Sequence, residues 1–221
     1  MKLHHVIEAQ QFDLPTISHL FGLAEEMEQL VAQGGTVEYQ NRLMATLFYE
    51  PSTRTRFSFE AAMHRLGGRV ISTENAAEFS SVAKGETLED TVRILNGYVD
   101  VIVLRHSEVG AAKRASLVSR VPIINAGDGM GQHPTQALLD LYTIRKEIGS
   151  IDGLKIAMVG DLAQGRTVRS LAYLLSKFKD IKMYFVAPPL LKMKEDILEH
   201  LRERGVSFTE EVMLDRVLPE V

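Results

Sequence analysis

The 221-residue sequence has no cysteine and no tryptophan, and only 7% of its residues are aromatic. The absence of cysteine excludes disulfide bonds, thiolate zinc sites and cysteine nucleophiles. No apolar run approaches the ~20 residues that a membrane-spanning helix needs. The first five residues, MKLHH, lack the apolar core of a signal peptide. These absences predict a protein of the cytoplasm that has no membrane partner.

Neither positive nor negative charge is in large excess, because the net charge is only −4. A negative chain has no general affinity for nucleic acid or for anionic membranes. Any anionic ligand must therefore be bound by a local cluster of basic residues. The seven histidines show no metal-ligand spacing, and the glycines after residue 159 lack the G-x-G-x-x-G spacing of dinucleotide sites. We expect no metal and no cofactor.

Apolar strand-like runs alternate with helical patterns along the first 150 residues, which is typical of a parallel, doubly wound α/β sheet. The expected strands are residues 43–49, 69–73, 99–104 and 121–126. The expected helices are residues 14–31, 57–66, 87–98, 108–119 and 135–148. Thr87 is the predicted N-cap of its helix, with Glu89 and Asp90 in the first turn.

A hinge-like segment, residues 149–153, separates this region from a second α/β region. There the expected strands are residues 154–159, 181–186 and 206–209, the expected helices are 168–178 and 191–204, and residues 211–217 begin one more unit. We therefore predict a first domain at residues 1–134, a linking helix and hinge at 135–150, and a second domain at 151–221. About three strands are few against a mean sheet of ~5–6 strands, so the second domain is expected to be incomplete.

The most informative segment is Glu50-Pro51-Ser52-Thr53-Arg54-Thr55-Arg56, which stands between a predicted strand and a predicted helix. A helix N-terminus presents unpaired N–H groups and the positive end of the helix dipole, and both favour an anion. Hydroxyl groups and the planar guanidinium of Arg54 add donors that suit phosphate oxygens. The alternative is an ordinary capped helix. For Arg56, whose helical spacing turns it away from Arg54, a structural ion pair is expected.

Further polar residues follow the other strands, and ligands of open parallel sheets bind at such carboxyl ends. The third strand ends in Arg105 and His106, and the fourth leads through residues 125–129 to His133. Pro134 suits the first position of a helix and holds His133 extended. We expect His133 to be a neutral donor to a carbonyl oxygen; a structural histidine is the alternative.

These motifs carry a family resemblance. Residues 49–56 and 133–136 resemble the carbamoyltransferases, residues 84–91 resemble the mobile loop of aspartate carbamoyltransferase catalytic chains, and residues 160–168 resemble the start of their aspartate-binding domain. The similarity runs from His5 to Val221, and the sequence of residues 73–84 and 169–185 is most similar to the plant-type branch. Ornithine carbamoyltransferases share the Ser-Thr-Arg-Thr turn and remain an alternative, although the Gly165-Arg166-Thr167 element is not expected in them.

The resemblance implies a site for two anionic substrates, carbamoyl phosphate and L-aspartate. Its implied phosphate ligands are Ser52, Thr53, Arg54, Thr55 and Arg105. Thr55 and Arg105 are also implied near the carbamoyl oxygen, with His133 and Gln136, and Arg166 is implied to bind a carboxylate of aspartate. Ser80 and Lys84 are implied to come from a neighbouring subunit of a homotrimer with shared sites, where Glu86 helps to hold Arg54. The implied catalytic residues are Arg54, Thr55, Lys84, Arg105 and His133.

The reaction so implied is transfer of the carbamoyl group to aspartate, an early step of de novo pyrimidine biosynthesis, in the cytoplasm or the plastid stroma. Catalytic chains of this family run roughly a third longer, so a carbamoyl phosphate-binding module without turnover is the alternative. The plant-type sequence around Phe79 also suggests that uridine monophosphate is an inhibitor that binds in the same phosphate pocket.

Overall fold

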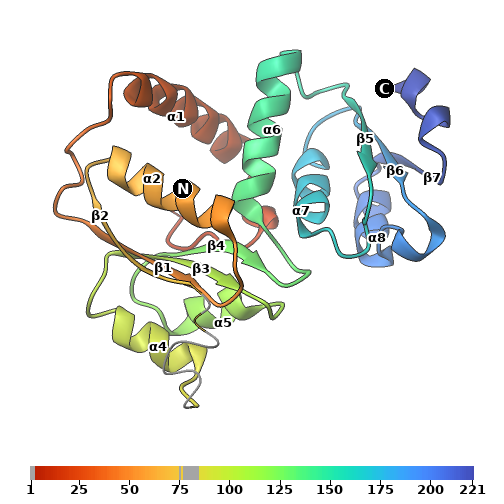
Figure 1. Cartoon of the computed structure of the whole chain (residues 1–221). Coiled ribbons are helices and arrows are strands. Elements are labelled where there is room, and N and C mark those ends of the chain that lie inside the picture. Colours follow the sequence, from red (N-terminus) through yellow and green to blue (C-terminus); the bar gives the residue numbers. More distant parts are fainter. Residues whose placement is uncertain (1–2, 75, 77–84) are drawn as a thin grey trace. The chain divides into compact units, whose positions relative to one another are not determined.

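The computed structural model describes residues 3–74, 76 and 85–221 (Figure 1). The chain forms two compact units: unit 1 is Met1–Ile7 with Ser18–Gly131, and unit 2 is Glu8–Ile17 with Gln132–Val221. Helix α1 (Leu14–Ala32) runs through this division. Within the described ranges, no helix combines the length and apolar character needed to cross a membrane.

Unit 1 contains a parallel sheet whose four strands follow the order β2-β1-β3-β4. The strands are β1 (Leu43–Phe48), β2 (Arg69–Thr73), β3 (Val101–His106) and β4 (Ile123–Asp128). Within residues 3–74, 76 and 85–221, three helices connect them: α2 (Thr53–Arg65), α4 (Leu88–Leu95) and α5 (Ala111–Val118).

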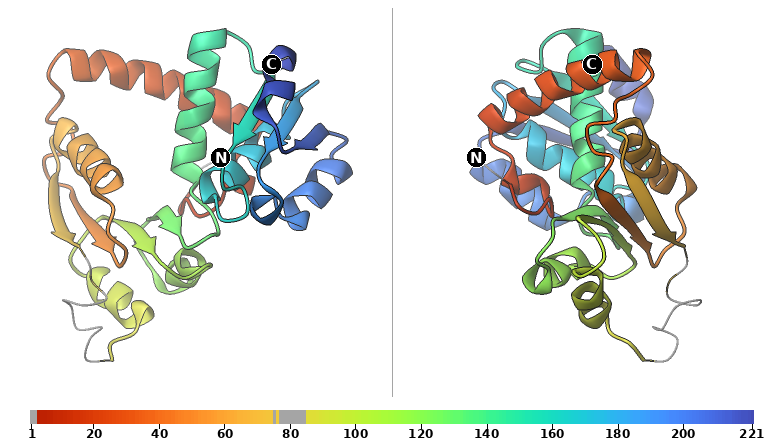
Figure 2. Two further views of the ribbon diagram at one scale, coloured as in Figure 1. Left: turned by 45° about the vertical axis from the view of Figure 1, so that its right-hand side comes forward. Right: turned by 90° about the vertical axis from the view of Figure 1, so that its left-hand side faces the viewer.

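Side chains of the central strand β1 alternate between two cores. Met44 and Phe48 pack with Met63 of α2 on one face, whereas Ala45 and Leu47 pack in the core that α4 and α5 cover on the other. Figure 2 shows α2 on the opposite side of the sheet from α4 and α5. Both faces of β1 are therefore buried, which explains why its sequence is a continuous apolar run.

Unit 2 contains a second parallel sheet with the strand order β5-β6-β7. Its strands are β5 (Lys155–Val159), β6 (Lys182–Val186) and β7 (Ser207–Glu211), and its helices are α6 (Pro134–Ile148), α7 (Arg166–Leu175) and α8 (Glu195–Glu203). Four 3-10 turns complete it: η1 (Ala9–Gln11), η3 (Pro189–Leu191), η4 (Leu214–Arg216) and η5 (Leu218–Glu220). Leu174, Met183 and Ile197 are fully buried in its core.

The predicted α/β class with two parallel sheets is confirmed, and so is Thr87 as the N-cap of α4, where its Oγ1 accepts from Asp90 N at 3.1 Å. Several boundaries differ by a few residues, and the clearest differences concern three segments. Helix α2 begins at Thr53, four residues before the predicted start, and Ser52 stands at its N-cap position. Helix α8 begins at Glu195 because the proline-containing turn η3 precedes it. The residues after β7 form short 3-10 turns in place of the predicted further unit.

Candidate phosphate site and associated residues

The strand order of unit 1 creates a switch point between β1 and β3. From β1 the chain moves to β2 on one side, and from β2 it crosses to β3 on the other side. The segments that follow β1 and β3 therefore leave the sheet toward opposite faces. Such a divergence opens a crevice at the carboxyl ends of the two strands, where ligands of parallel sheets bind.

The residues after β1 place a helix N-terminus at this crevice. Ser52 is the N-cap of α2, with φ −162° and ψ 89°, and its hydroxyl makes no capping hydrogen bond. The first helical bond runs from Arg56 N to Ser52 O at 3.0 Å. The N–H groups of Thr53, Arg54 and Thr55 precede that bond and have no acceptor within the helix. Three N–H groups and the hydroxyl of Ser52 are thus free to bind an external anion.

The two arginines of this turn differ in their surroundings. Arg54 is exposed, and its side chain has no partner among the residues that the structure describes. Arg56 forms ion pairs with Glu74, at 3.0 Å, and with Glu60, at 3.6 Å. The predicted structural ion pair of Arg56 is confirmed, so Arg54 is the arginine of this turn that is available to a ligand.

Arg105 supplies a second cation at the end of the neighbouring strand. It lies beside Phe48 of β1 in the register of the sheet, and only 9% of its side chain is exposed. Its Nη1 donates to Ala126 O at 3.2 Å, and its Nη2 donates to Glu50 Oε1 at 2.9 Å. Glu50 and the Ala126 carbonyl therefore hold the guanidinium at the end of β3.

The end of β4 is fixed by buried polar contacts. Asn125 Nδ2 donates to Asp128 Oδ1 at 3.2 Å, and Asp128 Oδ2 accepts from Gly110 N at 2.9 Å. Gly129 has φ +52°, and a Cβ there would lie 2.5 Å from the backbone oxygen of Ser107. The glycine is required because the protein's own backbone approaches it.

His133 and Gln136 lie at the start of α6 in unit 2. His133 is the N-cap, with φ −140° and ψ 73°, and Pro134 is the first helical residue as predicted. The buried His133 donates its backbone N–H to Ser170 Oγ at 3.0 Å, and its Nδ1 lies 3.4 Å from Thr135 Oγ1. The Gln136 amide donates to Asp140 at 2.8 Å; burial nevertheless raises the pKa of Asp140.

Arg166 is the first residue of α7, directly after the N-cap Gly165. A Cβ at position 165 would lie 2.7 Å from the backbone oxygen of Asp161, so this turn requires glycine. Ser170 is one helical turn after Arg166 and bonds to the backbone of His133. Helix α7, which begins at Arg166, is therefore joined to the start of α6 through Ser170.

The structure thus groups the predicted residues in two sets: Ser52, Thr53, Arg54, Thr55 and Arg105 in unit 1, and His133, Gln136 and Arg166 in unit 2. Ser80 and Lys84 lie outside the described residues, as does Phe79. Sequence reasoning missed Glu50 and Ser170 as partners of Arg105 and His133. Neither partner has a local signal: Glu50 meets Arg105 because β1 lies beside β3, and Ser170 is 37 residues from His133.

Comparison with known proteins finds relatives for nearly the whole chain. Residues 4–146 match the family model "Aspartate/ornithine carbamoyltransferase, carbamoyl-P binding domain". The chain is 62% identical over 210 residues to the chloroplastic aspartate carbamoyltransferase 1 of Pisum sativum. The alignment covers 95% of this chain and 54% of that protein. The chain therefore spans about half the length of this curated relative.

Two solved structures show the same architecture. The catalytic subunit of M. jannaschii aspartate transcarbamoylase has a TM-score of 0.89 at 52% identity, covering 97% of this chain and 70% of its own. Aspartate transcarbamoylase from Trypanosoma cruzi, in complex with carbamoyl phosphate and aspartate, has a TM-score of 0.88 at 45% identity, covering 93% and 65%. Identity to the pea protein exceeds identity to both, in agreement with the plant-type resemblance.

Proposed function

This chain belongs to the aspartate/ornithine carbamoyltransferase family, and from that premise we propose that it acts in the transfer of the carbamoyl group from carbamoyl phosphate to the amine of L-aspartate. The products are N-carbamoyl-L-aspartate and phosphate. One observation carries the proposal: the uncapped N-terminus of α2 lies beside the buried Arg105 at the switch point of a parallel sheet. The neighbour from T. cruzi, whose complex holds carbamoyl phosphate and aspartate, supports this choice of substrates.

In this proposal the phosphate of carbamoyl phosphate binds at the start of α2. The free N–H groups of residues 53–55 and the hydroxyls of Ser52, Thr53 and Thr55 donate to its oxygens. Arg54 adds a charged, two-armed donor. When Glu50 releases Nη2 of Arg105, this nitrogen can donate to the same phosphate. Arg105 also donates to the carbamoyl oxygen. Exchange of one carboxylate partner for a phosphate keeps the buried guanidinium compensated throughout.

The residues of unit 2, together with Thr55, bind the second substrate and the reacting carbonyl group. His133 and Gln136 donate to the carbamoyl group, and Arg166 binds a carboxylate of aspartate. The amine attacks the carbamoyl carbon and forms a tetrahedral oxyanion. The bond from that carbon to the phosphate oxygen then breaks, and the departing phosphate takes the amine proton. No covalent bond to the protein forms.

Charge explains why the site needs several cations in a protein of net charge −4. Both substrates carry more than one negative charge and repel each other, so catalysis consists mainly of holding them together and stabilising the oxyanion. Donors fixed in a water-poor site achieve this without reorganisation, and each is worth on the order of 3 kcal/mol.

The direct test measures formation of carbamoyl aspartate and, in parallel, carbamoyl phosphate binding by calorimetry. We expect both with the chain, and turnover with ornithine in place of aspartate would contradict the assignment. A second candidate is a carbamoyl phosphate-binding module without turnover. It is favoured by one finding, that the family model matches residues 4–146 as the carbamoyl-P binding domain. Binding without product under saturating aspartate would support this second candidate.

We also propose that the protein is a homotrimer with shared sites, in which Ser80 and Lys84 act on the neighbouring subunit, and that it works in the cytoplasm or the plastid stroma. Variants Lys84→Ala and Arg54→Ala provide the test of sharing. Randomly mixed trimers contain sites with both residues intact, so activity should recover to roughly a quarter of the native value. Mixed trimers without activity, despite verified subunit exchange, would place both residues in the site of one chain.

A further inference from the structure

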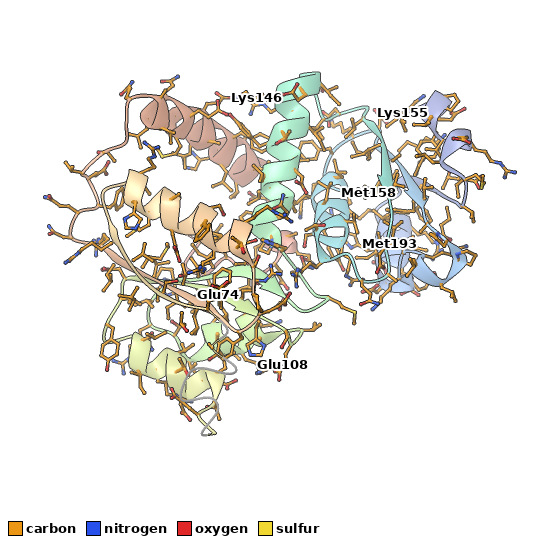
Figure 3. All side chains as sticks on the ribbon, viewed as in Figure 1. Glu74, Glu108, Lys146, Lys155, Met158 and Met193 are labelled. Atoms are coloured by element: carbon orange, nitrogen blue, oxygen red, sulfur yellow. The ribbon has the colours of Figure 1, made fainter. Side chains whose placement is uncertain are left out.

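A polar cluster lies between α2 and the sheet on a face that is otherwise apolar. We define the Arg56 cluster as Thr46, Arg56, Glu60, Ser72 and Glu74. Thr46 Oγ1 donates to Glu60 Oε1 at 3.0 Å and lies 2.8 Å from Ser72 Oγ. Ser72 Oγ lies 2.7 Å from Glu60 Oε1 and accepts from Arg56 Nη1 at 3.2 Å. Figure 3 labels Glu74, the outer member, after the end of β2.

The inner members of the cluster are largely removed from water, whereas Ser72 and Glu74 at its edge are exposed. Thr46 is 1% exposed, and the side chains of Arg56 and Glu60 are each 18% exposed. Its neighbours on the same face of β1 are the buried Met44 and Phe48. Burial of charged groups in such surroundings is costly, and well-packed apolar side chains often stabilise a core as well or better. The cluster therefore has its main value in fixing one arrangement of α2 on the sheet.

Helix geometry connects this arrangement to the phosphate site. Arg56 and Glu60 are four residues apart, so both point from α2 toward β1 and β2. Arg54 precedes Arg56 by two residues, which is about 200° around the helix. When Arg56 is held on the sheet side, Arg54 must point away from it. A rotation of α2 by one residue, about 100°, would move Arg54 and the hydroxyls of its turn away from the crevice.

The cluster also separates the charges of the two arginines. Glu60 and Glu74 place two carboxylates around the guanidinium of Arg56, so an approaching anion meets a group that is already compensated. Arg54 has no acidic partner among the described residues. The turn therefore offers its positive charge on one side only.

We propose that Arg56 is a positioning residue, which fixes the rotation of α2 through Glu60, Ser72 and Glu74 and so directs Arg54 and the N-terminus of α2 at phosphate. This inference rests on the proposed function of the same site. It assigns Arg56 no contact with substrate. Its effect on binding is exerted through the helix.

The test uses calorimetric titration of the chain with inorganic phosphate at pH 8, together with a urea unfolding curve for each variant. Arg56→Gln should weaken phosphate binding at least tenfold while the unfolding transition remains cooperative. The matched control is Arg65→Gln, which removes the same charge from an exposed position of the same helix and should stay within twofold of the parent chain. A folded Arg56→Gln chain with affinity within threefold of the parent would overturn the inference.

Two further variants distinguish positioning from general damage. Arg56→Lys keeps the charge and one ion pair, so its affinity should lie between those of the parent and Arg56→Gln. Glu74→Gln changes a side chain that is 39% exposed, so it should fold even if Arg56→Gln does not, and should weaken phosphate binding about threefold. Unchanged phosphate affinity in Glu74→Gln would overturn this inference but leave the proposed function standing. A parent chain that binds no phosphate would overturn the proposed function and this inference with it.

Discussion

Units 1 and 2 are built from the same strand–helix–strand connection, but they differ in strand order. In unit 1 the order β2-β1-β3-β4 contains a reversal, and α2 lies on the opposite face from α4. In unit 2 the order β5-β6-β7 follows the chain, and α7 and α8 share one face, where Ser176 Oγ lies 3.1 Å from His200 Nε2. Right-handed crossovers produce this contrast. Only the reversal opens a crevice at the strand ends, so topology decides where a helix N-terminus can receive an anion.

The helices that begin nearest the proposed site residues also repeat one arrangement of arginines. In α2, Arg56 is held by two carboxylates, and in α7, Arg169 is held by both oxygens of Asp196. Each anchored arginine follows a proposed ligand-binding arginine, Arg54 or Arg166, by two or three residues. In both units one arginine is held in ion pairs and the other is proposed to bind the substrate.

The largest effect is expected from Arg54, which tests whether unit 1 carries the anion site. Arg54→Ala should reduce the rate of carbamoyl-aspartate formation more than 100-fold, because loss of a preorganised donor costs on the order of 3 kcal/mol. The fold should remain intact because the side chain is exposed. Steady-state kinetics beside a urea unfolding curve check both statements. Retention of more than about a tenth of the parent rate would contradict the role.

Arg166 should have the next largest effect, and it tests the division of labour between the units. Arg166→Ala should raise the KM for aspartate about 10- to 100-fold, since hydrogen bonds to charged groups contribute about 1.5–3 kcal/mol. Binding of inorganic phosphate should be unchanged because its proposed ligands lie in unit 1. Lys155→Ala, at an exposed position of the same unit, is the control. Weakened phosphate binding in Arg166→Ala would show that the two units do not divide the substrates in this way.

The sequence predicted the parts of this comparison that depend on local patterns. The apolar run of β1, buried on both faces, predicted a parallel sheet, and the residues at the end of β1 predicted an anion site at a helix start. The start of α2 at Thr53 was missed because serine, threonine and arginine suit a turn as well as a first helical turn. Contacts across elements were not predictable, because the pairs Arg105–Glu50 and Arg56–Glu74 depend on strand order and register.

We expect uridine monophosphate to bind at the proposed anion site without reacting there. Its phosphate should bind at residues 52–55, so inhibition should be competitive with carbamoyl phosphate. If Phe79 stacks on the base, Phe79→Ala should weaken the nucleotide by about 1–3 kcal/mol, the range of base–aromatic stacking, and leave inorganic phosphate binding unchanged. Calorimetry with both ligands measures this difference. Carbamoyl phosphate binding that is unaffected by saturating nucleotide would end the hypothesis.

The smallest effect should come from His106, the last residue of β3, which is 9% exposed. Its Nδ1 accepts from Glu108 N at 3.0 Å, so the imidazole is neutral at this nitrogen. Burial lowers the pKa of His106, and Arg114 lowers this pKa further, while the carboxylates of Glu108, Asp128 and Glu89 oppose the shift. In the unfolded chain the ordinary pKa of about 6.5 returns.

As the pH falls through that ordinary pKa, the unfolded chain takes up the proton before the folded chain does. The free energy of unfolding therefore decreases with falling pH until the pH reaches the lower, folded pKa. His106→Asn removes this titration but keeps an acceptor for Glu108 N, because an asparagine side chain can bond the backbone two residues ahead. Urea unfolding midpoints measured between pH 7.5 and 5.5 should vary less in the variant than in the parent. Some variation should persist, because burial also lowers the pKa values of His5 and His200. Equal pH dependence in the two chains would show that His106 contributes nothing to it.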